Sequence, residues 1–118
     1  MITRKFIQEH RDTIFVYGDN FERRGFAGQA REARGESNTI GIPTKWRPNN
    51  NHDSFFYDTQ FDEVRSRIDA AFERIIIEKT LGRKIIFFPN IGMGYAALDD
   101  TAPKILEYIQ KRIKDIEK

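Results

Sequence analysis

The stretch that decides the fold is Lys84–Gly94, which reads KIIFFPNIGMG. Its first part, Lys84–Pro89, is a continuous apolar run of strand length, which is typical of a strand covered on both faces. Its second part, Asn90–Gly94, places two glycines directly after that strand. The run therefore predicts a parallel sheet between layers of helices, and such sheets bind ligands beyond the carboxyl ends of their strands.

Two further strands are expected earlier in the chain. Thr13–Tyr17 is a β-branched and aromatic run that stops at turn residues, and Thr39–Pro43 reads as a second buried strand. Ile2–Gln8 is a candidate for an additional strand beside the first. Trp46–Asp58 contains Pro48 and three consecutive asparagines, so we expect a loop and a mobile segment there.

Helices are expected between and after these strands. Gly25–Arg34 carries alanines at helical spacing and ends at a glycine. From Phe61 to about Lys79, apolar residues recur every three or four positions, which predicts an amphipathic helix. A last helix is announced by Asp99-Asp100-Thr101, with Pro103 in its first turn. The order β-α-β-α-β-α favours an α/β fold with a largely parallel sheet and helices on both faces.

The composition bounds the chemistry. A chain of 118 residues with 39% hydrophobic residues fits one domain, residues 1–118, and the net charge of +2 is too small for a broad nucleic-acid-binding field. There is no cysteine and there are two separated histidines, so we expect no thiol chemistry, no metal and no cofactor. Without an apolar leader or a membrane-length run, the cytoplasm is the expected compartment and no membrane partner is expected.

Glycines and polar or charged residues follow each of the three predicted strands. Gly18-Asp19-Asn20, Thr44–Arg47 and Asn90–Tyr95 would meet at one edge of a parallel sheet. The first continues into Gly25–Gln29, at the start of a short helix. Each glycine-rich loop could cradle a phosphate or simply turn the chain, and two on one edge suggest a diphosphate. No GxxxxGK[ST] or GxGxxG motif occurs, which disfavours ordinary NTPases and Rossmann dehydrogenases.

Several of these residues have two interpretations. Lys45 could bind phosphate or act as a nucleophile of lowered pKa, or it could be an ordinary exposed lysine. Trp46 could stack on a base or pack in the core. Asp19 and Asn20 could contact a ligand or form a turn. Asp99 and Asp100 could cap the last helix or take part in acid–base chemistry.

Three segments of the chain resemble the compact macrodomains, the ADP-ribose-binding α/β family. They are Gly25–Ala30 (GFAGQA), Ile42–Arg47 (IPTKWR) and Phe88–Gly94 (FPNIGMG). The resemblance is to the DNA-ADP-ribose hydrolase antitoxins and the related terminal ADP-ribose glycohydrolases, and it runs from about Thr13 to Ile116. It implies a compact three-layer α-β-α fold with a mostly parallel mixed sheet.

The resemblance also implies a site. The diphosphate of ADP-ribose, or of a related NAD-derived nucleotide, would lie between Gly25–Ala30 and Gly92–Tyr95, and Lys45 matches the lysine that attacks the distal ribose. The family's acidic partner corresponds to Ala96, and the nearest carboxylates are Asp99 and Asp100. The candidate catalytic residues are Lys45, Asp99 and Asp100. The candidate ligand-binding residues are Asp19, Asn20, Gly25, Phe26, Ala27, Gly28, Gln29, Thr44, Trp46, Asn90, Ile91, Gly92, Met93, Gly94 and Tyr95.

Three functions follow as hypotheses. The chain could bind ADP-ribose and hydrolyse it from modified DNA or protein. It could hold such a nucleotide without cleaving it. A third hypothesis is a nucleic-acid or protein adaptor on the same fold, which would use Arg23, Arg24, Lys45 and Arg47.

Overall fold

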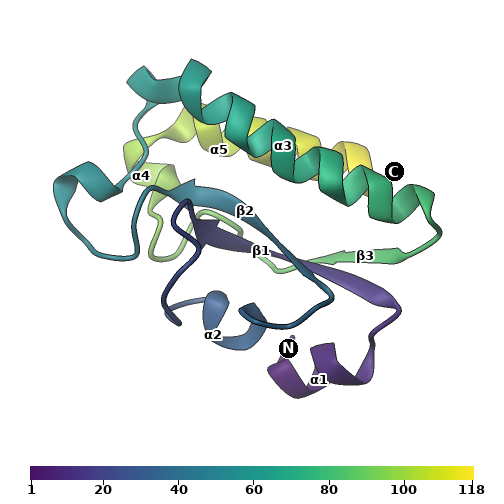
Figure 1. The fold of residues 1–118 in the computed structure, drawn as a ribbon. Coiled ribbons are helices and arrows are strands. Elements are labelled where there is room, and N and C mark those ends of the chain that lie inside the picture. The colour runs from purple at the N-terminus through teal and green to yellow at the C-terminus, as the bar shows by residue number, and fades with distance from the viewer.

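A three-stranded parallel sheet organises the chain, and the computed structural model describes all residues from 1 to 118. The strands are β1 (Thr13–Asn20), β2 (Thr39–Lys45) and β3 (Lys84–Phe87), in the order β2-β1-β3. Both neighbouring pairs are parallel, and helices lie on both sides of the sheet (Figure 1). The predicted α/β class is confirmed. The sheet is not mixed, because the one antiparallel pairing is an isolated bridge from Lys45 to Phe55.

The strand register brings three connections to the same edge of the sheet. Asn20, the last residue of β1, lies opposite Lys45, the last residue of β2. The shorter β3 ends at Phe87, opposite Val16. The chain then continues beside β1, since the Phe88 amide donates to the Val16 carbonyl at 2.7 Å. The segment after β3 is thereby carried to the edge where the other two strands end.

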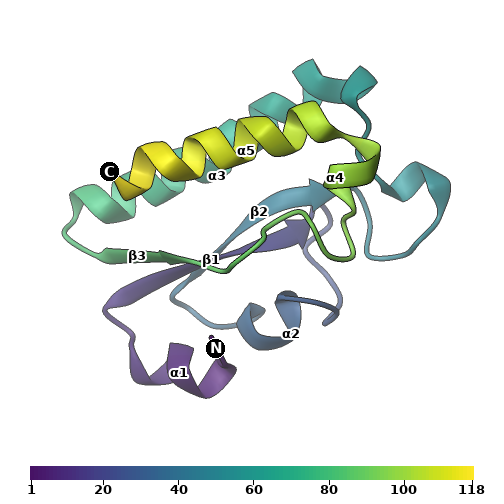
Figure 2. The same cartoon turned by 180° about the vertical axis from the view of Figure 1, so that it is seen from behind.

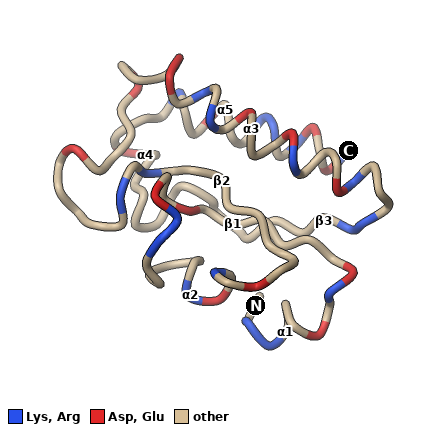
Figure 3. The backbone as a smooth tube through the Cα atoms, in the orientation of Figure 1, with Lys and Arg blue, Asp and Glu red and all other residues tan.

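Two long helices cover one face of the sheet. These are α3 (Phe61–Thr80) and α5 (Pro103–Glu117), which lie side by side in both views (Figures 1 and 2). The predicted stripe of α3 is buried at Val64, Ile68 and Phe72, which pack toward β2. Figure 3 shows positive and negative residues interspersed along α3.

The opposite face carries two short helices, and here the sequence expectations fail in part. Ile2–Gln8 is not a strand: α1 (Arg4–Glu9) is a helix, capped by the Thr3 hydroxyl, which accepts from the Phe6 amide at 3.1 Å. Only Ile7 of this helix is buried, so the segment has no apolar alternation that would seat a strand. The predicted helix Gly25–Arg34 shortens to α2 (Ala30–Ala33).

The last helix begins differently from the expectation. Asp99 and Asp100 do not cap it, because they belong to a separate short helix, α4 (Leu98–Thr101). The first amides of α5, those of Lys104 and Ile105, donate instead to the Asp58 carboxylate, both at 3.1 Å. Asp58 thus ties the start of α5 to the segment before α3.

The segment expected to be a loop contains two short 3-10 helices, η1 (His52–Ser54) and η2 (Asp58–Gln60). Trp46 packs edge-to-face on the fully buried Phe56, with ring centroids 4.8 Å apart. Its indole N–H donates to the Gln60 side chain at 3.2 Å. These contacts fasten the segment to the body of the domain. No helix in the chain combines the length and apolarity that a membrane span requires.

Candidate functional site

A cavity of about 500 Å³ opens at the edge of the sheet where the strands end. It draws its walls from β1, β2, the segment before α2 and the segment after β3. The sequence-predicted residues that line it are Asp19, Asn20, Gly25, Ala27, Gly28, Gln29, Thr44, Lys45, Asn90, Gly92, Gly94 and Tyr95. Residues far apart in the chain therefore form one pocket.

Six of the predicted site residues lie outside this lining. Ile91 and Trp46 pack in or against the core, while Phe26 is exposed at 65% and Met93 at 40%. The interpretation of Trp46 as a core residue is thus the one the structure supports. Asp99 and Asp100 are exposed on α4 and do not line the pocket.

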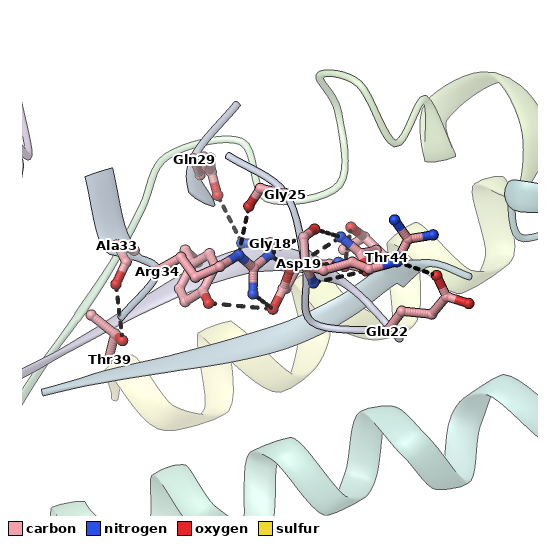
Figure 4. Close-up of polar contacts among 12 residues, drawn as sticks. Gly18, Asp19, Glu22, Gly25, Gln29, Ala33, Arg34, Thr39 and Thr44 are labelled. Atoms are coloured by element: carbon pink, nitrogen blue, oxygen red, sulfur yellow. Dashed lines mark hydrogen bonds and ion pairs between the residues drawn. The ribbon is translucent and has the colours of Figure 1, made fainter. Parts of the chain in front are cut away.

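The end of β1 is held by an ion pair. The Asp19 carboxylate accepts from the guanidinium of Arg34, at 3.1 Å for one nitrogen and more closely for the other (Figure 4). The Tyr17 hydroxyl also donates to Asp19, at 3.3 Å, and burial together with this carboxylate raises the pKa of Tyr17 to about 12. A Cβ at Gly41 would lie 2.8 Å from the Asp19 Cβ, so position 41 on β2 makes room for this aspartate.

The segment between β1 and α2 forms the outer wall. The Asn20 side chain closes its first turn by donating to the Arg24 carbonyl at 2.7 Å. Gly25 and Gly28 both have positive φ, at 90° and 60°. A side chain at Gly28 would come within 3.1 Å of the Tyr95 ring, so the glycine permits close contact between the two loops.

Gln29 joins the two walls of the pocket. Its amide oxygen accepts from the Gly18 amide at 2.8 Å, and its amide nitrogen donates to the Pro89 carbonyl at 2.7 Å. One side chain thereby satisfies a backbone donor on β1 and a backbone acceptor after β3. This contact sets the distance between the two glycine-rich loops.

The loop after β3 presents free backbone donors. Gly92 has φ of 89°, and a Cβ there would lie 2.7 Å from the Leu98 side chain, so any other residue would be strained in this turn. The amides of Gly92, Gly94 and Tyr95 donate to no atom of the chain. Backbone N–H groups of this kind in a turn can bind an anion.

Lys45 supplies the positive charge at the end of β2. It is 6% exposed, and its ammonium donates to the Asn49 carbonyl at 2.7 Å and lies 4.4 Å from the centre of the Phe55 ring. No carboxylate pairs with it. Burial lowers the pKa of Lys45 below its ordinary value of 10.5. A buried ammonium with neutral partners favours an anionic ligand.

The carboxylates of the pocket are already engaged. Asp19 is bound to Arg34, and Glu32 accepts from the Arg4 amide at 2.8 Å. Ala96 lines the pocket close to the glycine loop, where the macrodomain resemblance places an acid. No group of three or more metal-ligating side chains is present.

Sequence reasoning missed several residues that shape the site. Arg34 follows a short helix with no pattern that marks it as a partner of Asp19. Asn49 and Phe55, which contact the Lys45 ammonium, belong to the segment that the sequence predicts to be mobile. The run of asparagines at 49–51 was the one available signal, since asparagine stabilises turns by side-chain hydrogen bonds.

The fold and the pocket define a small parallel α/β protein with an anion-compatible cavity at the carboxyl ends of its strands. Residues 1–112 match the model of a protein family described as "Family of unknown function (DUF7831)", and the chain belongs to that family. No curated protein and no solved structure matches the chain.

Proposed function

We propose that this protein binds ADP-ribose or a related NAD-derived nucleotide in the cavity at the strand ends. The observation that carries the proposal is the meeting of two glycine-rich loops and Lys45 around one cavity of about 500 Å³. This volume lies within the range of roughly 300–1,000 Å³ typical of small-molecule sites. A three-layer macrodomain-like fold belongs to the same proposal.

The diphosphate is assigned to the space between Gly25–Gln29 and Gly92–Tyr95. Free amides at Gly92, Gly94 and Tyr95 would donate to its oxygens, and Gln29 keeps this loop in place against β1. The ammonium of Lys45 would supply the compensating charge. These groups bind an anion without a metal.

Hydrolysis of an ADP-ribosyl bond is the second candidate function, with ADP-ribosylated DNA or protein as its substrate. The lowered pKa of Lys45 favours it, because a larger fraction of the amine is then neutral and nucleophilic at a given pH. Against it, neither Asp99 nor Asp100 lines the pocket, and position 96 is an alanine. Binding is therefore the primary proposal.

The test is calorimetric titration of ADP-ribose into the wild type, Lys45→Ala and Lys111→Ala. Lys111 is exposed on α5 away from the cavity, so it serves as the matched control. We expect saturable binding in the wild type and in Lys111→Ala, and a loss of roughly tenfold or more in Lys45→Ala, as for a charged hydrogen bond.

Product analysis separates the two functions. Incubation with ADP-ribosylated DNA and protein, followed by chromatography, yields free ADP-ribose only if the chain hydrolyses the bond. Absence of heat with ADP-ribose and with NAD in the folded wild type would overturn the binding proposal. Turnover unchanged in Lys45→Ala would remove the role of this lysine as a nucleophile.

A further inference from the structure

A second cavity, of about 400 Å³, lies beside the first, and Asp19 and Asn20 line both. We call it the arginine pocket, because four of its lining residues are Arg23, Arg34, Arg67 and Arg74. They come from three separate parts of the fold: the loop after β1, the end of α2 and helix α3. Like charges that meet at one cavity repel one another, and an anion between them would remove this repulsion.

The charges of the arginine pocket are not balanced within the chain. Asp19 is its one lining carboxylate, and that group is bound to Arg34. The other three arginines, Arg23, Arg67 and Arg74, form no ion pair. Three arginines without an ion-pair partner thus line one cavity.

Arg67 is positioned like a receptor for an oxyanion. Its guanidinium lies over the Phe21 ring, 4.1 Å from the ring centre, and 5.5 Å from the centre of the Trp46 ring. Its Nε is buried and has no hydrogen-bond partner. Stacking fixes the plane of the guanidinium. Its two terminal nitrogens form no hydrogen bond within the chain, so they are the donors available to a bidentate acceptor.

Small residues leave room in front of these donors. The arginine pocket is walled by Gly41 of β2 and by Ala70 and Ala71 of α3. A side chain at position 41 would collide with Asp19. The short side chains of the two alanines on α3 leave the space of the pocket unfilled. The space is a pocket between β2 and α3, open on one side, and not a stripe along the surface, so it suits a compact group better than a polymer backbone.

We infer that the arginine pocket binds a phosphate monoester or diphosphate carried by a small molecule, at a site separate from the cavity of Lys45. The oxygens of the phosphate would accept from Arg67, and Arg74 and Arg23 would supply further charge. Asp19 and Arg34 would form the wall between the two sites.

The experiment is an NMR titration that follows the side-chain Nε–H signals of the arginines, with pyrophosphate and adenosine 5′-monophosphate as probes. The expected result is a saturable shift of the Arg67 signal. In Arg67→Lys, which keeps the charge but loses the planar fork, we expect the shifts of the remaining arginine-pocket signals to need roughly tenfold more probe. Arg74→Ala, at an exposed position, should weaken binding about threefold.

Two controls separate this site from the first. Arg65→Ala removes an exposed arginine of the same helix that does not line the pocket, and binding should stay unchanged. In Lys45→Ala the Arg67 shift should persist even when ADP-ribose binding to the first cavity is lost. Absence of ADP-ribose binding in the folded wild type, together with a saturable Arg67 shift, would overturn only the proposed function.

The inference is overturned if the Arg67 signal does not move with either probe in the folded wild type. It is also overturned if Arg67→Lys and Arg74→Ala bind both probes like the wild type. A shift seen only with a 5′-phosphorylated single-stranded oligonucleotide would contradict the small-molecule assignment, because the pocket would then contact a polymer.

Discussion

Arg34, directly after α2, donates two hydrogen bonds from its guanidinium to the carboxylate of Asp19, near the end of β1. The Asp19 and Arg34 side chains are only 6% and 13% exposed, so neither charge has much contact with water. The pair connects the short helix on one face to the strand that carries the site. The same ion pair therefore stabilises the domain and holds Asp19 in place in the cavity wall.

Arg34→Ala should lower the free energy of unfolding by about 3 kcal/mol, because it leaves the Asp19 carboxylate buried without its partner. Urea denaturation followed by circular dichroism measures this. The double variant with Asp19→Asn should recover part of the loss, since no unpaired charge then remains. A change below about 0.5 kcal/mol in Arg34→Ala, the usual surface range, would contradict this account of the pair.

Gly92→Ala should destabilise the protein by about 1–3 kcal/mol through its positive φ and its collision with the buried Leu98. Gly94→Ala is the matched control, because its φ is not positive and a Cβ there meets nothing within 4 Å. Its stability should stay within about 0.5 kcal/mol of the wild type. Equal thermal shifts in the two variants would show that the turn does not require glycine at position 92.

Lys45 should make stability depend on pH in the alkaline range. Its pKa is lowered in the folded state, so the unfolded chain holds the proton to higher pH than the folded chain does. The free energy of unfolding should therefore rise with pH between the lowered pKa and the ordinary value of 10.5, relative to Lys45→Met. Urea denaturation of both proteins over this range tests the sign; parallel curves would refute the effect.

Gln29→Leu should weaken ligand binding and cost about 1–3 kcal/mol of stability, because the Gly18 amide and the Pro89 carbonyl both lose their partner. Calorimetry and urea denaturation report the two effects. Gln110→Leu is an exposed glutamine control on α5 and should change neither. Full retention of ADP-ribose affinity in Gln29→Leu would show that the spacing of the two loops does not depend on this bridge.

Trp46→Phe should leave ADP-ribose affinity within about twofold of the wild type while it lowers stability, since the ring packs on Phe56 and does not line the cavity. Lost affinity with unchanged stability would favour a stacking role for the indole instead.

The elements that repeat an apolar pattern could be predicted from the sequence. Ile68 and Phe72 lie four residues apart on α3, and both face the core as the period requires. The six residues of α1 bury only Ile7, and a single apolar contact defines no period. Its helical state depends on the Thr3 cap and on packing against α2, which a pattern cannot express.

The meeting of Lys45, Gly28 and Gly92 at one cavity could be foreseen, because parallel strands end at the same edge. The side-chain partners could not. Asp19 and Arg34 are fifteen positions apart, and their pairing depends on where α2 docks. The stacking of Arg67 on Phe21 likewise joins α3 to the loop after β1, and no local signal marks either residue.

The tight approach of Gly41 to Asp19 makes these positions epistatic. A methyl group at position 41 collides with Asp19. A shorter residue at position 19 leaves the guanidinium of Arg34 without its partner, and a shorter residue at position 34 leaves the Asp19 carboxylate buried without its partner. The effects of single substitutions at positions 19, 34 and 41 will not add. A redesign of either cavity should vary the three positions together. The side chains at any two of them determine which side chain the third can carry.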